Sequence, residues 1–207
     1  MKTKHIYLIR HGQTDYNKMG IVQGSGVDTD LNETGRAQAQ AFFDTYKDIP
    51  FDKIYTSKLK RAVQSVDGFL KLGIPHESFE GLNEISWGNK DGIKVSQDDK
   101  DYYQQVMNEW ANGNVAMPVQ GGESPVEVLE RQIPVINYIL SKYEEENILI
   151  CMHGRAIRIL LCYLLGRELS QMDTFEHTNL GLYQMIYEDF EMKLHLANNT
   201  THLDTKI

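Results

Sequence analysis

Short apolar segments that favour strands alternate along this chain with amphipathic segments that favour helices, and this alternation restricts its fold more than any other feature. We expect strands at His5–Ile9, Lys53–Thr56, Glu77–Phe79 and Asn147–Met152, and helices at Asn32–Lys47, Lys58–Leu72, Glu123–Tyr143 and Gly154–Leu165. Two further strands, Leu180–Tyr187 and Phe190–Ala197, are expected around a turn at Glu188-Asp189. This order predicts an α/β fold of three layers, in which helices flank a largely parallel central sheet.

Two stretches depart from the alternation. Residues 12–31 are rich in Gly, Asn, Asp and Thr and are expected to form a loop. Residues 81–122 hold a Gly-rich loop, a polar helix near Ser96–Trp110 and a second loop that ends in Gly121-Gly122. We expect a single domain over residues 1–207, with residues 81–122 as a lid inserted over one end of the sheet.

Composition excludes several classes of protein. Apolar residues make up 41% and charged residues 24% of 207 residues, which is ordinary for a globular protein. The net charge of −8 argues against a nucleic-acid partner or an anionic membrane surface. The apolar run Ile159–Leu165 is far shorter than the roughly 20 residues of a membrane span, and the N-terminus lacks a signal-peptide core, so we expect a cytoplasmic protein. The two cysteines, Cys151 and Cys162, lie in apolar surroundings and are expected to be buried thiols.

Polar residues that can take part in catalysis or ligand binding follow the expected strands. Arg10-His11-Gly12 follows the first, Arg61 lies about one turn into the helix after the second, Glu84 follows the third, and His153-Gly154 follows the strand near residue 150. Parallel sheets bind ligands outside the carboxyl ends of their strands, so these side chains are expected to meet at one edge. Each residue alone is more often structural. Their joint occurrence favours a functional site.

The set suits phosphoryl transfer through a histidine. Guanidinium groups fit phosphate oxygens, and Gly after each His lets backbone amides approach a bound anion. A neutral imidazole is a nucleophile that a cation-rich pocket keeps unprotonated, and a glutamate can protonate the leaving alcohol. This chemistry needs neither a metal nor a cofactor, and no HxH, HxxxH or HExxH metal-ligand spacing occurs. The sequence therefore predicts a phosphohistidine site.

Four blocks of sequence resemble the histidine phosphatase superfamily, the phosphoglycerate mutase-like proteins. The blocks, in order, are Arg10-His11-Gly12-Gln13-Thr14 with Asn17, Ser57-Lys58-Leu59-Lys60-Arg61-Ala62, Leu82-Asn83-Glu84-Ile85, and Met152-His153-Gly154 with Ile157-Arg158. The resemblance implies a sheet flanked by helices and a lid over the site. It also implies that His11 becomes phosphorylated, that Glu84 donates a proton, and that Arg10, Arg61 and His153 hold the phosphoryl oxygens. By the same resemblance Asn17, Gln23, Gly24 and Gly154 contact the substrate.

The sequence leaves three functions open. Residues 93–122 contain no arginine, and Arg155 follows His153-Gly154 where mutases of the family typically have Asn. Both features favour a phosphatase acting on a small phosphorylated metabolite over a cofactor-dependent phosphoglycerate mutase. The third candidate is an inactive phosphate-binding regulatory protein, which should lack at least one of His11, Arg61, Glu84 and His153; all four are present. A homodimer stays open.

Two further residues carry alternative interpretations. Arg155 should lie in the first turn of a helix, where the macrodipole opposes a cation by about 0.3–1 kcal/mol, so an anion should compensate it. That anion is either an acidic side chain at the surface or a second anionic group of the substrate. His177 is either a surface histidine or a side chain that reaches the rim of the site.

Overall fold

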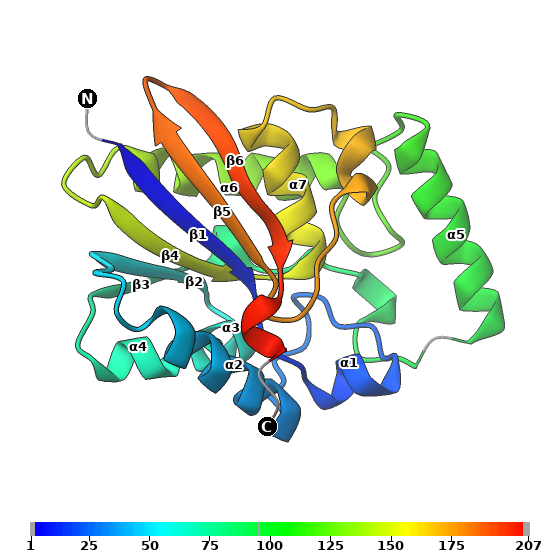
Figure 1. Ribbon diagram of the computed structural model, residues 1–207. Helices are drawn as coiled ribbons and strands as arrows, with labels where there is room; N and C mark the ends of the chain where they lie inside the picture. Colours follow the sequence, from blue (N-terminus) through cyan, green and yellow to red (C-terminus); the bar gives the residue numbers. More distant parts are fainter. Residues whose placement is uncertain (1–2, 95, 205–207) are drawn as a thin grey trace.

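A computed structural model describes residues 3–94 and 96–204, and within these residues six strands form one sheet (Figure 1). The strands are β1 (Lys4–Arg10), β2 (Lys53–Ser57), β3 (His76–Phe79), β4 (Asn147–Met152), β5 (Leu182–Glu188) and β6 (Glu191–Asn199). Their order across the sheet is β3-β2-β4-β1-β5-β6. The α-helices are α1 (Asp15–Met19), α2 (Glu33–Tyr46), α3 (Lys60–Ser65), α4 (Asp67–Lys71), α5 (Gln97–Ala111), α6 (Pro125–Leu140) and α7 (Gly154–Leu164).

The sheet is mostly parallel, as the alternation of strands and helices predicts. β1 pairs parallel with β4, β4 with β2, and β2 with β3, whereas β5 and β6 add an antiparallel hairpin beside β1. Arg10, the last residue of β1, lies opposite Met152, the last residue of β4. The residues that follow these two strands therefore leave the sheet at the same edge.

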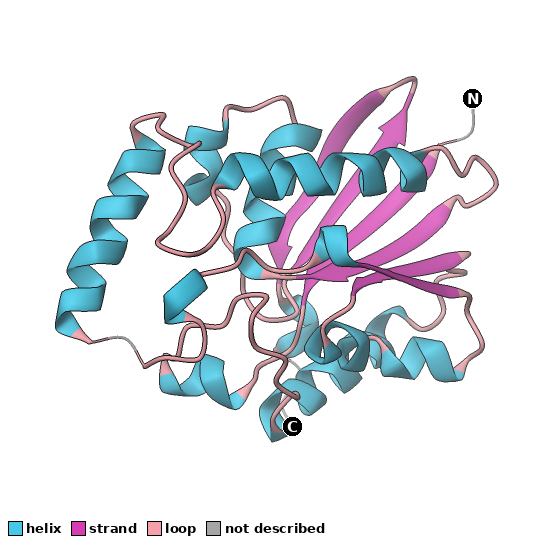
Figure 2. Ribbon diagram, turned by 180° about the vertical axis from the view of Figure 1, so that it is seen from behind, coloured by secondary structure: helices cyan, strands magenta, loops and turns pink. Residues whose placement is uncertain are grey.

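Helices cover both faces of the sheet, which gives the three expected layers (Figures 1 and 2). Side chains of β1 alternate between the two cores because successive residues of a strand point to opposite faces. Ile6 and Leu8 lie in the core that holds residues of α6 and α7, and Tyr7 and Ile9 lie in the core that holds residues of α2, α3 and α4.

The helix expected over Lys58–Leu72 is broken into α3 and α4, and this prediction was wrong at Val66. The hydroxyl of Ser65 donates a hydrogen bond to the carbonyl of Arg61 at 2.6 Å. Such a bond from a helical serine to the carbonyl four residues earlier tends to bend the helix. Val66 then has φ −114° and ψ 7°, outside helical geometry, and a new helix begins at Asp67.

The segment expected as a loop over residues 12–31 contains the short helix α1, which was not predicted from the sequence. Thr14 caps this helix: its hydroxyl accepts from the backbone N–H of Asn17, and the side chain of Asn17 accepts from the backbone N–H of Thr14. This reciprocal pair is a capping box, with Asn in the place usually taken by Glu or Gln. Gly20 ends the helix with φ 66°, a conformation that glycine adopts without a steric penalty.

Residues 81–122 leave the sheet and carry α5 to one end of the molecule (Figure 1). The carboxylate of Asp91 ties this excursion to the loop after α1, because it accepts the backbone N–H groups of Gly24 at 2.7 Å and Gly26 at 3.0 Å. Lys94 forms an isolated bridge with Ile21. The excursion and residues 20–26 therefore lie against each other.

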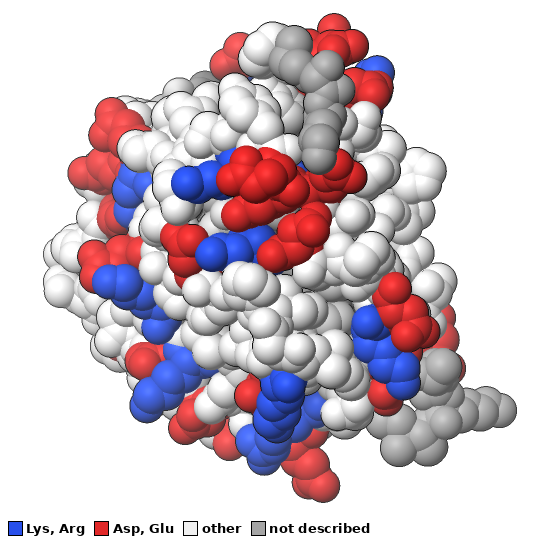
Figure 3. Space-filling view, turned by 90° about the vertical axis from the view of Figure 1, so that its left-hand side faces the viewer, with Lys and Arg blue, Asp and Glu red and all other residues white. Residues whose placement is uncertain are grey.

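The distribution of charge on the face opposite α5 agrees with the net negative charge of the sequence. At the end of the molecule opposite α5, acidic side chains gather and basic side chains lie among them (Figure 3). Within the described part of the chain, no helix is long and apolar enough to cross a membrane.

Candidate active site

His11 follows β1 directly and is almost fully buried, with 2% exposure. Its backbone N–H donates to the carbonyl of Met152 at 3.0 Å, and its Nδ1 lies 2.7 Å from the carbonyl oxygen of Gly12. A carbonyl only accepts, so Nδ1 carries the proton and the lone pair is on Nε2. Burial, and then the charges of Arg61 and Arg10, lower the pKa of His11 well below its usual 6.5. The imidazole is therefore neutral at pH 7.

Gly12 allows the chain to pass the start of α2 at very short range. A Cβ on Gly12 would lie 2.6 Å from the carbonyl oxygen of Gly35. The backbone N–H of Gly12 donates to the hydroxyl of Ser65 at 2.9 Å. The serine that breaks the α3–α4 helix thus also holds the loop that carries His11.

His153 follows β4, precedes α7 and is fully buried. Arg61 donates from Nε to its Nδ1 at 3.3 Å, and its Nε2 lies 2.7 Å from the hydroxyl of Ser57. Since Arg cannot accept, Nδ1 is the acceptor and the Nε2–H donates to Ser57. Burial, and then Arg61, lower the pKa of His153 well below 6.5, so it is neutral at rest. The ring centroids of His153 and His11 are 5.1 Å apart.

Arg61 is fully buried in α3 and is held by backbone carbonyls. Its Nη1 donates to Val27 at 2.7 Å and its Nη2 donates to Gly24 at 3.0 Å. Burial lowers the pKa of Arg61 to about 10, while the nearby carboxylate of Glu84 opposes this shift. The group remains a cation at pH 7, in a fixed orientation.

Arg10 lies beside His177, for which the sequence allowed either a surface position or one at the rim of the site. Arg10 Nη1 donates to the carbonyl of His177 at 2.7 Å and to its Nδ1 at 3.1 Å. Burial, and then the charge of Arg10, lower the pKa of His177 to about 3, so this half-buried histidine is a neutral acceptor for Arg10. Arg10 Nε is buried without a hydrogen-bond partner. A buried donor of this kind suits an anionic ligand.

Glu84 is buried at 7% exposure, and its carboxylate caps α7. Oε2 accepts from the backbone N–H of Arg155 at 3.0 Å, and Oε1 accepts from those of Ala156 and Ile85, both at 2.9 Å. Arg131 donates to the carbonyl of Glu84 at 2.9 Å and holds its loop from outside. The charge of Glu84 raises the pKa of Arg10 against the larger effect of burial, so the carboxylate and this guanidinium influence each other electrostatically.

The other residues predicted for the site lie around this group. Asn17 accepts at Oδ1 from the side chain of Asn179 at 3.3 Å, and Asn179 also donates to the carbonyl of His11 at 2.8 Å. Gly24 supplies its carbonyl to Arg61, and Gln23 accepts at Oε1 from Thr14 at 2.9 Å. Gly154 begins α7 under the ring of His177, where a Cβ would lie 2.9 Å from Nδ1.

Arg155 has an anionic partner within the fold. Its Nη1 donates to Asp173 at 2.6 Å, its Nη2 lies 3.0 Å from the sulfur of Met107, and its guanidinium lies over the ring of Trp110 at 5.5 Å. This ion pair supplies the compensating anion that a cation in the first turn of α7 requires. The interpretation of Arg155 as a contact for a second anion of the substrate stays a prediction.

Three residues that hold the site were not predicted from the sequence: Ser57, Ser65 and Asn179. Ser57 and Ser65 bond directly to His153 and to the backbone of Gly12, and Asn179 bonds to the backbone of His11. Only Ser57 had a usable signal, because it is the residue that ends β2 at the ligand-binding edge. The other two are polar residues whose partners are distant in sequence.

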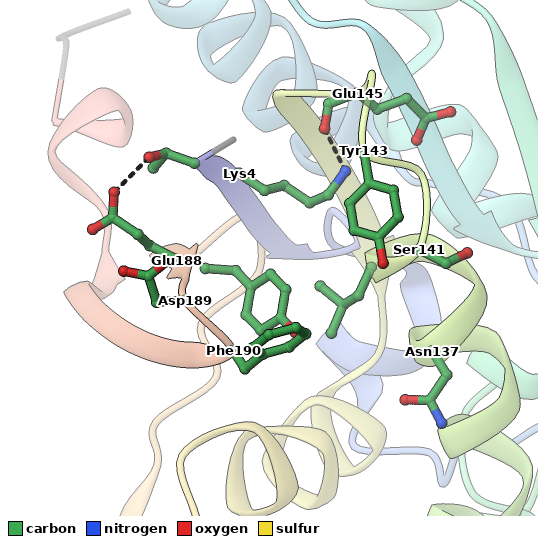
Figure 4. Close-up of a pocket in the computed structure, with 11 residues that line it drawn as sticks. Lys4, Asn137, Ser141, Tyr143, Glu145, Glu188, Asp189 and Phe190 are labelled. Atoms are coloured by element: carbon green, nitrogen blue, oxygen red, sulfur yellow. Dashed lines mark hydrogen bonds between the residues drawn. The ribbon is translucent and has the colours of Figure 1, made fainter. Parts of the chain in front are cut away.

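A cavity of about 180 Å³ lies at the opposite end of β1 (Figure 4). It is lined in part by Lys4, Tyr143 and Phe190, and it contains none of the predicted site residues. The Lys4 ammonium donates to the carbonyls of Lys142 and Glu145. Its charge is thus used inside the fold, and the cavity lacks the arrangement of groups found around His11.

Residues 6–200 match the family described as histidine phosphatase superfamily, branch 1. A probable phosphatase of Schizosaccharomyces pombe is 33% identical over 69% of this chain and 74% of its own length. A 2,3-bisphosphoglycerate-dependent phosphoglycerate mutase of Cytophaga hutchinsonii is 29% identical over 92% of this chain and 90% of its own.

The fold matches solved structures of the same kind. A mycobacterial glucosyl-3-phosphoglycerate phosphatase superposes with a TM-score of 0.84 and 26% identity, covering 95% of this chain and 100% of that one. Phosphatases and a mutase thus occur among its relatives, as the motifs predict. The chain belongs to branch 1 of the histidine phosphatase superfamily.

Proposed function

We propose that this protein is a phosphomonoester hydrolase that transfers the phosphoryl group first to His11 and then to water. The observation that carries the proposal is the hydrogen bond from His11 Nδ1 to the carbonyl of Gly12, which leaves the Nε2 lone pair available near the buried Arg61 and the half-buried Arg10. Relatives named as phosphatases support the same activity. The proposed substrate is a small phosphorylated metabolite.

In the first step, the Nε2 lone pair attacks phosphorus, the N–P bond forms and the bond from phosphorus to the leaving oxygen breaks. Glu84, in its protonated form, gives a proton to the leaving alkoxide, which departs as the alcohol. In the second step, the Glu84 carboxylate takes a proton from water as the water oxygen attacks phosphorus. His11 and inorganic phosphate are released, and the net reaction consumes one water per ester.

Arg10 and Arg61 are proposed to hold the equatorial phosphoryl oxygens, over which negative charge is spread in the transition state. The unpartnered Arg10 Nε is a ready donor for one oxygen. Fixed cations in a buried pocket stabilise developing charge without reorganisation, which is the role that metals fill in other phosphatases. We therefore propose a metal-independent reaction, and turnover should persist in excess EDTA.

Hydrolysis is favoured over mutase chemistry because Arg155, the cation that replaces the mutase Asn, already pairs with Asp173. The alternative function, a phosphoglycerate mutase, is supported by the mutase relative of Cytophaga hutchinsonii. Both activities can be measured in one reaction, with 3-phosphoglycerate as substrate and 2,3-bisphosphoglycerate as primer. We expect any turnover of 3-phosphoglycerate to release inorganic phosphate; isomerisation to 2-phosphoglycerate without phosphate release would establish the mutase instead.

An inactive regulatory protein would bind phenyl phosphate without turning it over. The proposed hydrolase instead releases phenol and inorganic phosphate. The closeness of His11, Arg61 and His153 supports the enzyme. The net charge of −8 gives no reason to propose a nucleic-acid partner, and the cytoplasmic location stays a prediction.

A further inference from the structure

A second cavity, of about 330 Å³, lies beside the candidate site. It is lined by residues 20–23, Trp87, Tyr103 and Met107. None of these lining residues is charged. The rings of Trp87 and Tyr103 meet edge to face, with centroids 5.4 Å apart and an interplanar angle of 86°. Apolar cavities of about 150 Å³ already hold a benzene ring, so this one has room for a ring and its substituents.

One wall of the cavity is joined to the phosphate-binding groups through the loop after α1. Gln23 accepts from the hydroxyl of Thr14, three residues after His11. The next residue, Gly24, supplies the carbonyl that holds Arg61 Nη2. A Cβ on Gly24 would lie 2.9 Å from Cδ1 of Trp87, so this loop packs directly on the opposite wall.

The other wall is joined to Glu84. Trp87 lies three residues after Glu84, and the sulfur of Met107 lies 3.0 Å from Arg155 Nη2. Arg155 in turn donates its backbone N–H to the Glu84 carboxylate. One wall is therefore connected to Arg61, which is proposed to hold the phosphoryl group, and the other to Glu84, which is proposed to protonate the leaving oxygen.

Cations near the cavity have other partners or face solvent. The guanidinium of Arg155 lies against the sulfur of Met107, and its positive charge pairs with Asp173 at 2.6 Å. Lys94 is bridged to Ile21 through the backbone, and its side chain is exposed. A second anionic group on the substrate would lie against uncharged side chains here, without a cation among the lining residues.

We propose that this cavity binds the leaving group, and that the preferred substrates are monophosphate esters of uncharged alcohols that carry an apolar ring. The inference rests on the proposed phosphatase function and narrows it to a substrate class. An aromatic pair that meets edge to face presents ring surface on which another ring packs well. Esters with a carboxylate or a second phosphate are the disfavoured class.

The side chain of Gln23 adds one polar feature to the proposed class of substrates, an oxygen atom on the leaving alcohol. Its Oε1 accepts from the hydroxyls of both Thr14 and Thr29, at 2.9 and 2.5 Å, which orients the carboxamide. The Nε2 of Gln23 is left buried without a hydrogen-bond partner. A buried donor without an acceptor is unfavourable, so an oxygen on the bound alcohol would be stabilising at this position.

The test compares esters whose leaving alcohols have similar reactivity. Ethyl phosphate, phenethyl phosphate and para-carboxyphenethyl phosphate differ in the ring and in its charge, while each leaves as a primary alkoxide. We expect kcat/KM for phenethyl phosphate to exceed that for ethyl phosphate by about 10- to 100-fold, from burial of the ring. We expect the para-carboxylate to reduce kcat/KM by about tenfold or more relative to phenethyl phosphate.

Each outcome separates this inference from the proposed function. Equal kcat/KM for ethyl and phenethyl phosphate, or a preference for the carboxylated ester, would overturn the cavity assignment while hydrolysis itself still stood. No turnover of any of the three esters would overturn the proposed function, and the cavity inference with it.

A charge introduced into the cavity gives a second test. Val22 lines the cavity, and its backbone is held by Ile93 and Gly92, so a new side chain leaves these hydrogen bonds in place. Val22→Lys should raise kcat/KM for para-carboxyphenethyl phosphate relative to phenethyl phosphate by about 5- to 10-fold, since a charge-assisted contact is gained. Leu72→Lys, at a position 58% exposed on the end of α4, is the matched control and should leave the ratio unchanged. An unchanged ratio in Val22→Lys would contradict the inference.

Discussion

Arg61 donates a hydrogen bond from Nε to Nδ1 of His153 across 3.3 Å, and both side chains are fully buried. The bond assigns the tautomer of His153 and turns its Nε2–H toward Ser57. Arg61 therefore has two tasks, since it orients a histidine as well as presenting a cation.

Ser57 should matter for stability because it is the acceptor for the Nε2–H of His153. Ser57→Ala leaves that buried donor without a partner, which should reduce the free energy of unfolding by about 1–3 kcal/mol. Urea unfolding measures the change. Ser141→Ala, an exposed serine that bonds only to a carbonyl of its own helix turn, is the control and should change it by less than about 0.5 kcal/mol. Equal losses in the two variants would contradict the role given to Ser57.

Glu84→Gln should slow alkyl phosphates more than aryl phosphates, because poor leaving groups need the proton most. General acid catalysis typically contributes 10²- to 10⁴-fold, so the ratio of the two kcat/KM values should change by at least about tenfold. Glu84 also caps α7, and a glutamine cannot accept at both positions, so some loss should occur with every ester. Equal losses on ethyl and phenyl phosphate would mean that Glu84 acts only through the position of α7.

Stability should fall as the pH drops below about 6.5. Burial lowers the pKa of His11 and His153 well below 6.5 and that of His177 to about 3. The unfolded chain binds protons at these groups near pH 6.5 while the folded chain does not, so acid favours the unfolded state. Each group contributes at most about 1.4 kcal/mol per pH unit in this window.

The contribution of His177 can be isolated by comparing variants. His177→Asn should reduce the slope of unfolding free energy against pH between about pH 6.5 and 5, whatever its effect on stability at pH 7.5. His195→Asn replaces an exposed histidine of β6 and is the matched control. The same slope in wild type and His177→Asn would show that His177 titrates normally.

Arg155→Ala should change kcat/KM by the same factor for esters with and without a second carboxylate. Its guanidinium pairs with Asp173, which keeps Arg158 as a partner at 2.7 Å, and its bond to Glu84 comes from the backbone. Steady-state kinetics on the ethyl, phenethyl and para-carboxyphenethyl esters measures this. A selective loss of about 10- to 150-fold for the carboxylated ester would instead identify Arg155 as a contact for a second anion.

Much of the fold was predictable because its signals are local. Apolar strands and amphipathic helices have distinct periods, and parallel strands end at one edge, so His11 and His153 could be brought together from sequence alone. The break at Val66 was not predictable, since it depends on Ser65, whose hydroxyl is held between Arg61 and the distant backbone of Gly12. A helix favoured by local propensity was overridden by a tertiary contact.

The sequence likewise predicted only part of the candidate site. Histidine and arginine after strands are conspicuous, whereas Asn179 reaches His11 across 168 positions and resembles any loop asparagine in the sequence. The partner of Arg155 was equally hidden, because Asp173 lies 18 residues away in a 3-10 turn that has no hydrophobic period. The chemical groups were thus visible, but the contacts that orient them were not.

The central claim is a covalent phosphohistidine at His11, and rapid-quench labelling tests it most directly. The wild-type protein is mixed briefly with radiolabelled phenyl phosphate, quenched in base, in which phosphohistidine survives, and mapped by peptide. We predict label on His11 alone, with no label and less than about a hundredth of the activity in His11→Ala. Label on any other residue, or full turnover in His11→Ala, would contradict the account.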